Sequence, residues 1–381
     1  MNIQLIMKKQ LLSFVALLCV VWLTPTRALA WNFVVDGIYY TVTSSSYPHT
    51  VEVASHEFYG TITIPEIVVY DYIAYTVTSI GEEAFAYCSD NISVKIPATV
   101  TSIGHQAFYQ STGLISIEIP ASVISIGDEA FRECSGLTSI EIPKSVTSIG
   151  AYAFMYCTGL TSIEIPNSVT SIGDGAFHRC SGLTSINIPA SVTSIGRGAF
   201  ARCSGLTSIE IPNSVTSIEH QAFYYCSGLK SIKIPASVTA IGEYAFMNCS
   251  GLTSIEIPAS VTSIEHEAFS GCSGLTEIFS RASEPPVCNY KAWLYVNKST
   301  CTLYVPAGTK DAYAAASEWE DFINIEEFDT TDITALDAEA TDTDLSDCEI
   351  YTAGGQRVDE LQAGTNIVRM KNGKVKKIVK R

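Results

Sequence analysis

The sequence predicts an α/β solenoid, a right-handed, horseshoe-like coil with a parallel β-sheet on its concave face and a β-rich N-terminal cap. Three observations predict this fold. Ala-Phe pairs recur nine times and Ile-Pro pairs eight times, both with a period of 23 residues. The residues before each Ile-Pro pair alternate between apolar and polar, which is typical of a strand. A unit this short cannot bury its own apolar faces, so successive units are expected to stack.

One repeat shows how the coil is built. Leu137, Ile140 and Ile142 fall in an L-x-x-L-x-L pattern and are expected to point inward. Ser139 and Glu141 alternate with them and are expected to point outward. The proline that follows has no N–H donor and ends the strand. The later Val, Ile and Ala-Phe residues of the unit return to the core. A 23-residue period also lies inside the range of about 20–29 residues of leucine-rich repeats.

Two further columns recur at fixed positions of the repeat. A serine after each strand can donate once and accept twice, so this column is expected to satisfy backbone groups of the turns. The Gly of the Ile-Gly pairs is replaced by Glu219 and Glu265 in two repeats, so this slot is not expected to require a positive φ. The serines are Ser122, Ser145, Ser168, Ser191, Ser214, Ser237 and Ser260, and the glycines are Gly104, Gly127, Gly150, Gly173, Gly196 and Gly242.

The composition divides the chain into six parts. Asp36-Gly37 predicts a tight hairpin near the start, the period breaks at Pro285-Pro286, and residues 310–318 predict a short Ala-rich helix. Residues 326–349 carry ten acidic side chains and no basic one, which is typical of a solvated linker. We expect a signal peptide at 1–30, an N-terminal β cap at 31–79, about nine coils at 80–279, a C-terminal cap at 280–328, an acidic linker at 329–349 and a small β tail at 350–381.

The N-terminal residues have the three parts of a secretory signal. Lys8 and Lys9 precede the apolar run of residues 11–23, and Ala28-Leu29-Ala30 is an A-x-A cleavage site. The apolar run is shorter than the roughly 20 residues of a spanning helix. Cys19 leaves a lipid anchor open, although the bulky Leu18 precedes it. The sequence therefore predicts a secreted protein that is displayed at the cell surface after cleavage and has no membrane span.

The charge balance restricts the partners. The chain carries 39 acidic and 23 basic residues, a net charge of −16. Nucleic acids and anionic membranes both need a basic footprint, so neither is an expected partner. An extracellular protein or glycan remains, and the chain is expected to be a monomer without cofactors.

Cysteine and histidine suggest little chemistry. Stacked cysteines would have Cβ atoms farther apart than the roughly 3.8 Å of a disulfide, so the column is expected to hold buried thiols. Cys288 and Cys301 in the irregular cap are the candidate disulfide. His220 and His266 are two coils apart, too far for one metal ion. The column comprises Cys134, Cys157, Cys180, Cys203, Cys226, Cys249 and Cys272, with Cys88 before it and Ser111 in the missing place.

The outward strand positions are the candidate binding site. The sequence contains no G-x-S-x-G, P-loop or G-x-G-x-x-G motif, so no catalytic residue is expected. The sheet of a solenoid is where such proteins bind partners, although the carboxylates could equally serve only to keep the sheet soluble. The candidates are Glu118, Glu141, Glu164, Glu210 and Glu256.

The unit L-T-S-I-E-I-P-x-S-V-T-S-I-G-x-x-A-F-x-x-C resembles the BspA-like leucine-rich repeat family of host-associated bacteria, over residues 33–328. The tail at 350–381, with Gly-Gly-Gln-Arg-Val and a lysine-rich end, is similar to C-terminal sorting domains of the type IX secretion route. The resemblance implies a non-enzymatic surface protein, often an adhesin for host or neighbouring-cell molecules. A structural surface coat is the alternative, followed by an enzyme acting on glycans or peptides.

Overall fold

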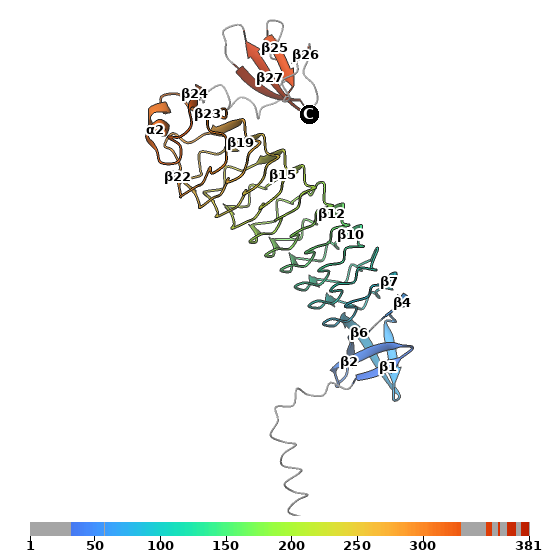
Figure 1. Cartoon of the computed structure of the whole chain (residues 1–381). Helices are drawn as coiled ribbons and strands as arrows, with labels where there is room; N and C mark the ends of the chain where they lie inside the picture. The colour runs from blue at the N-terminus through green and yellow to red at the C-terminus, as the bar shows by residue number, and fades with distance from the viewer. Residues whose placement is uncertain are drawn as a thin grey trace, which may run out of the picture.

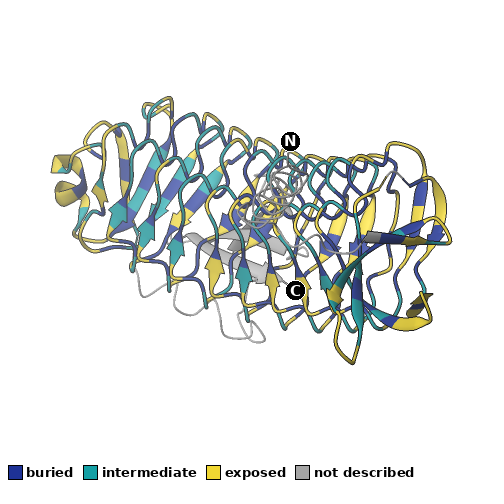
Figure 2. Ribbon diagram, turned by 90° about the horizontal axis from the view of Figure 1, so that it is seen from below, coloured by how far each residue is buried: buried dark blue, intermediate teal, exposed yellow. Residues whose placement is uncertain are grey.

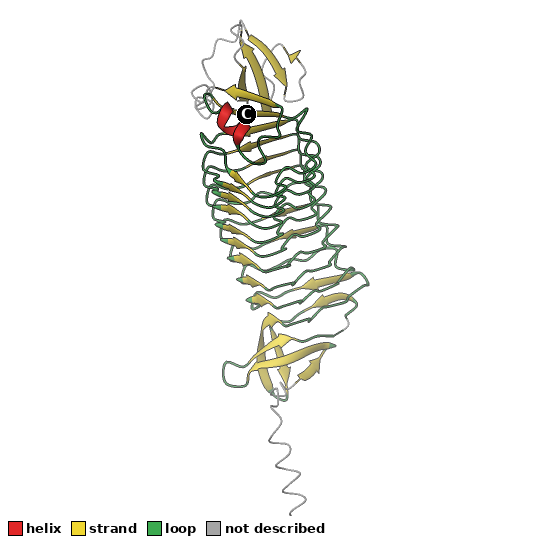
Figure 3. Cartoon of the chain, turned by 60° about the vertical axis from the view of Figure 1, so that its left-hand side comes forward, coloured by secondary structure: helices red, strands yellow, loops and turns green. Residues whose placement is uncertain are grey.

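The computed structural model describes residues 32–56, 58–328, 348–352, 357–358, 364–370 and 375–380. It is a parallel β-solenoid of about 12 turns, which confirms the predicted solenoid of 23-residue repeats. Figures 1 and 3 show a long, nearly straight stack, flatter than a horseshoe. The predicted signal peptide at 1–30 and residues 329–347 of the acidic linker lie outside the described residues.

The predicted strands form a parallel ladder along one side of the solenoid. Each residue pairs with its equivalent one repeat later, as Ile140 does with Ile163. Isolated bridges continue the ladder between its strands, as from Glu164 through Asn187 to Glu210. We call the outward surface of this ladder the strand face. Its strands are β4 (Gly60–Thr63), β7 (Ile92–Lys95), β10 (Ser139–Glu141), β12 (Ser162–Glu164), β15 (Ser208–Glu210), β17 (Ser231–Lys233), β19 (Ser254–Ile257), β21 (Glu277–Ser280), β23 (Thr302–Pro306) and β24 (Asn324–Phe328).

A second parallel ladder, which the sequence analysis did not predict, follows the Val-Thr-Ser-Ile segment of each repeat. Ile149 pairs with Ile126 on one side and Ile172 on the other. Its side chain is buried, as expected, but its backbone also forms a strand. The strands are β8 (Ser102–Ile103), β9 (Ser125–Ile126), β11 (Ser148–Ile149), β13 (Ser171–Ile172), β14 (Ser194–Ile195), β16 (Ser217–Ile218), β18 (Ala240–Ile241), β20 (Ser263–Ile264) and β22 (Val287–Cys288).

The third side of each coil consists of turns. In the described residues the one helix is α2 (Lys310–Ala315), in the C-terminal cap, so the α part of the predicted class is confined to that cap. The turns are not helical because two residues of each coil have a left-handed backbone. Tyr152 and Tyr156, for example, have φ angles of 56° and 62°. Their N–H groups donate to the next coil, at Asp174 O (2.7 Å) and His178 O (2.8 Å), instead of continuing a helix. We call this surface the turn face.

The core is a set of columns that run the length of the solenoid. Phe85 to Phe269 stack with ring centroids 5.1 to 5.7 Å apart and nearly parallel planes, and Trp293 continues the stack at 4.5 Å. Figure 2 shows the buried residues repeating from coil to coil. Dispersion between such rings adds to the roughly 1.5–3 kcal/mol that each buried apolar side chain contributes.

The serine and glycine columns behave as predicted. Six of the seven serines donate to the valine carbonyl of the preceding coil, as Ser191 does to Val169 O at 2.7 Å. The glycines of the Ile-Gly pairs have no positive φ. Glycine is favoured there by close packing, since a Cβ on Gly150 would lie 2.7 Å from the backbone of Gly127.

The two ends of the solenoid are closed differently. At the N-terminus, β1 (Asn32–Val35) and β2 (Ile38–Ser44) form the predicted hairpin, with φ of 52° at Asp36 and 79° at Gly37. The strands β3 (Thr50–Val53), β5 (Ile67–Tyr70) and β6 (Ile73–Ile80) then lead into the second ladder. At the other end, Tyr313 of α2 donates to Ala282 O (2.9 Å) and Trp319 donates to Pro286 O (2.9 Å).

The tail contains a separate antiparallel sheet in the order β26-β25-β27-β28. Its strands are β25 (Cys348–Thr352), β26 (Arg357–Val358), β27 (Gly364–Met370) and β28 (Val375–Lys380). Within the described residues, no helix has the length and apolar character needed to cross a membrane.

Candidate functional site

The strand face places the five predicted glutamates in one exposed row. In β10 and β12 the central isoleucine is buried while the flanking Ser and Glu are exposed. The parallel register sets Glu141 directly beside Glu164. Adjacent strands lie about 4.8 Å apart, so each carboxylate is a close neighbour of the next. Glu118, Glu210 and Glu256 are exposed in the same way.

The row is not uniformly acidic. Glu210 pairs with Lys233 (3.3 Å) and Glu256 with Arg281 (2.9 Å), so these two carboxylates are neutralised within the protein. The other three, Glu118, Glu141 and Glu164, make no ion pair with any described residue. We call these three residues the acidic ladder. Lys233 occupies the same strand position as these glutamates, whereas Arg281 follows β21, and its pairing depends on the fold.

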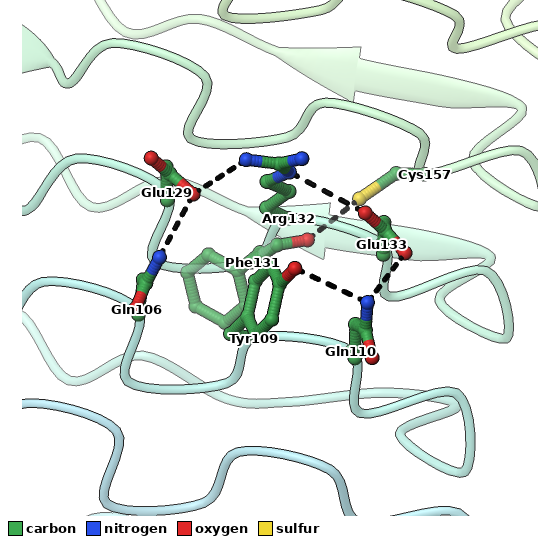
Figure 4. A network of polar contacts seen from close by, with 8 residues as sticks. All are labelled: Gln106, Tyr109, Gln110, Glu129, Phe131, Arg132, Glu133 and Cys157. Carbon is green, nitrogen blue, oxygen red and sulfur yellow. Dashed lines mark hydrogen bonds and ion pairs between the residues drawn. The ribbon is translucent and has the colours of Figure 1, made fainter.

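Polar side chains on the turn face form a network that joins two successive coils (Figure 4). Arg132 lies between Glu129 and Glu133, with N···O distances of 2.8 and 3.4 Å. Gln106 and Gln110 donate to the same two carboxylates, each at 2.9 Å. Burial alone would raise the pKa of Glu129, but these hydrogen bonds and the charge of Arg132 outweigh burial and lower it. The network pairs the charge of Arg132 with two carboxylates of the protein, so it stabilises the turns.

The cysteine column has a specific structural role. Each thiol donates to the phenylalanine carbonyl of the preceding coil, as Cys157 does to Phe131 O at 3.0 Å. Ser111 makes the equivalent bond to Phe85 O. The column thus contributes hydrogen bonds as well as the apolar volume that the sequence predicts. Burial raises the pKa of Cys157, Cys226 and Cys272 to about 12, which disfavours the reactive thiolate.

The candidate disulfide between Cys288 and Cys301 is not formed in the structure, which holds both residues as separate thiols. Cys288 ends β22 in the second ladder, whereas Cys301 immediately precedes β23 in the first. The two residues therefore enter the coil from different sides.

The histidines do not assemble into a metal site. His220 faces Glu243 at 3.5 Å, and His266 faces Glu267 at 3.4 Å. Each of the two histidines faces its own carboxylate. Among the described residues, no group of three or more His, Cys, Asp or Glu could hold a metal ion.

Comparisons with known proteins point to one repeat family. The family model described as "BspA type Leucine rich repeat region" matches residues 51–183 and 193–285 in 6 copies. A leucine-rich cell surface protein of Faecalibacterium prausnitzii is 26% identical over 82% of this chain and 98% of its own, with a TM-score of 0.46. A leucine-rich repeat protein of Bacteroides ovatus is 25% identical over 78% and 100%, with a TM-score of 0.31. No curated protein matches the sequence.

Proposed function

Because the chain belongs to the BspA-type leucine-rich repeat family, we propose that it is a non-enzymatic adhesin at the cell surface. The family supports a protein-interaction role there, and the solenoid offers a long, regular surface for it. The partner is an extracellular protein of a host or a neighbouring cell, which binds the strand face through a basic patch. The acidic ladder is the observation that carries this proposal.

The acidic ladder is unfavourable for the isolated protein. Like charges about 5 Å apart repel by roughly 0.8 kcal/mol per pair even in water. Lys233, at the equivalent strand position, relieves this repulsion beside Glu210, and Arg281, which follows the next strand, relieves it beside Glu256. A basic partner would relieve the repulsion in the remaining coils and would be attracted before contact.

The test is a charge reversal of the ladder. The variant Glu118→Lys, Glu141→Lys, Glu164→Lys is compared with wild type for binding to purified extracellular matrix and mucosal proteins by biolayer interferometry. We expect wild type to bind a basic member of the panel with strong salt dependence and the variant to lose that binding. All three side chains point away from the core, so folding should be preserved.

The matched control carries Glu66→Lys, Glu284→Lys and Glu320→Lys. These residues are exposed, lie off the strand face and, within the described residues, form no ion pair, so the net charge changes equally. The control should bind like wild type. If the charge-reversed variant still binds, the acidic ladder is only a solvated surface and not the binding site. Self-association of the purified protein without a ligand would instead favour a surface coat.

Display at the outer surface is part of the same proposal. The signal segment at 1–30 is expected to be cleaved before Trp31, and the tail at 350–381 to serve as the sorting domain. Deletion of 350–381 should leave the solenoid folded but retained in the periplasm. Protease accessibility on intact cells and N-terminal sequencing measure the two steps. Normal surface display of the truncated chain would remove the sorting role from the tail.

A further inference from the structure

The turn face carries a groove of about 340 Å³ that crosses four successive coils. Its central positions are Arg179 and Arg202, and Tyr156 and Tyr225 occupy the equivalent positions in the coils on either side. Four hydroxyl-bearing residues complete the lining: Thr158, Ser181, Ser204 and Ser227. Each lining position is the same place in the repeat, so the solenoid itself brings these side chains into register.

Aromatic rings hold both guanidinium groups in place. Arg179 lies 4.9 Å from the ring centroid of Tyr156, and Arg202 lies 4.6 Å from that of Tyr225. A guanidinium over an aromatic face keeps its N–H edge available for a bidentate bond to a carboxylate or sulfate. Arg179 and Arg202 come from adjacent coils, which are about 4.8 Å apart, and their guanidinium groups lie over tyrosines on opposite sides of the pair.

The positive charge of the groove is not neutralised by the protein. Arg132 and Arg281 pair with carboxylates, whereas Arg179 and Arg202 pair with none in the described part of the chain. The Nε atom of Arg179 is buried and has no hydrogen-bond partner among the described residues. Burial and the charges of both groove arginines lower the pKa of the neighbouring His178. An unpaired cation pair is unexpected in a chain with a net charge of −16.

The backbone at these positions is left-handed. Arg179 and Arg202 have φ of 61° and 60°, in the left-handed region that favours glycine. Gly271 occupies the equivalent position of a later repeat with φ of 74°. Tyr156 and Tyr225 share this conformation in the flanking coils, with φ of 62° and 56°, so the position is left-handed whichever side chain it carries.

We propose that this groove binds an acidic polysaccharide, whose carboxylate or sulfate groups are bound by the guanidinium groups of Arg179 and Arg202. The lining consists of guanidinium, tyrosine and hydroxyl groups and contains no aliphatic residue, which fits a hydroxyl-rich sugar better than a peptide side chain. The volume is near the lower end of the roughly 300–1,000 Å³ of small-molecule sites, enough for a short stretch of the polymer. This site is distinct from the acidic ladder, which attracts the opposite charge.

The test uses the whole mature chain and defined oligosaccharides. Isothermal titration calorimetry compares a heparin-derived oligosaccharide, an oligogalacturonate and neutral dextran. We expect at least one of the acidic sugars to bind and dextran not to bind. Binding of the oligogalacturonate would show that carboxylates suffice, whereas binding of the heparin fragment alone would show that sulfate is required. The variant Arg179→Gln, Arg202→Gln should weaken binding roughly 10-fold or more, because charge-assisted hydrogen bonds are lost. Arg179→Lys, Arg202→Lys keeps the charge but loses the planar guanidinium that makes bidentate bonds. Its affinity should therefore lie between those of wild type and the glutamine variant.

The matched control is Lys144→Gln, Arg197→Gln, which removes the same charge from two exposed residues outside the groove. It should bind within about 2-fold of wild type if the groove is the site. Circular dichroism melting checks that each variant is folded. If the glutamine variant does not fold, the lysine variant is used in its place to test the role of the two guanidinium groups. The proposal is overturned if neither acidic sugar binds, if the control loses affinity as the groove variant does, or if oligoglutamate or single-stranded DNA binds as well as the sugars.

Discussion

The strand face and the turn face come from the same 23 residues but obey different rules. On the strand face the backbone is extended and each outward side chain alternates with a buried isoleucine, so Glu, Asn and Lys exchange freely at one position. On the turn face two residues per coil adopt positive φ, and alternate N–H groups bind the next coil. Both faces vary their side chains from coil to coil, but only the turn face does so on a left-handed backbone, which costs energy for every residue other than glycine.

The largest expected effect comes from the phenylalanine stack beneath the turn face. Phe177 is fully buried, with ring neighbours at 5.5 Å on both sides. Phe177→Ala should lower the free energy of unfolding by about 3–5 kcal/mol, whereas Ile163→Val under the strand face should lower it by about 0.5–1.5 kcal/mol. Urea denaturation measures both, with Phe177→Leu as an intermediate control. Equal losses would show that both sides contribute alike to the core.

The buried thiols should make the turn side sensitive to alkaline pH. The pKa of Cys157 is raised to about 12 by burial, against about 8.5 in the unfolded chain. Because the folded state holds this proton more tightly, its contribution to stability is complete below pH 8.5 and is lost as the pH rises toward 12. Between pH 8 and 9.5, wild type should lose about 1 kcal/mol more than Cys157→Ser. Parallel curves for the two proteins would contradict the buried thiol.

Substitution by glycine should have opposite signs on the two faces. Gln221 has φ of 58°, so Gln221→Gly should be more stable than Gln221→Ala by about 1 kcal/mol. Ser208 lies in β15, where Ser208→Gly should be less stable than Ser208→Ala by about 0.5–1 kcal/mol. Thermal melting of the four variants gives both differences. The same sign at both positions would remove the conformational distinction between the faces.

The smallest effect is expected on the strand face itself. Glu141→Gln removes a carboxylate beside Glu164 and should change the free energy of unfolding by less than about 0.5 kcal/mol, toward higher stability. Lys233→Gln breaks the ion pair with Glu210 and should lower the free energy of unfolding slightly. High salt should diminish both differences, because it screens exposed charges. A large loss of stability in Glu141→Gln would mean that the ladder has a structural role.

The sequence by itself determined the repeat, its period and the side of the strand on which each residue lies. Ile140 and Glu141 could be placed because alternation along a strand is a local property. The serine column and the Asp36-Gly37 hairpin followed from local chemistry as well.

The tertiary structure decided whatever depends on neighbouring coils. The second ladder at Ser148–Ile149 is only two residues long, too short to give a periodic signal, and exists because identical segments stack. The left-handed conformation of Arg179 and Arg202 cannot be read from residues that seldom adopt it; hydrogen bonds to the next coil impose it. The register between coils also decides which carboxylates form ion pairs and which arginines remain unpaired. Glu256 and Arg281, for example, are separated by more than one repeat in the sequence but lie together in the fold.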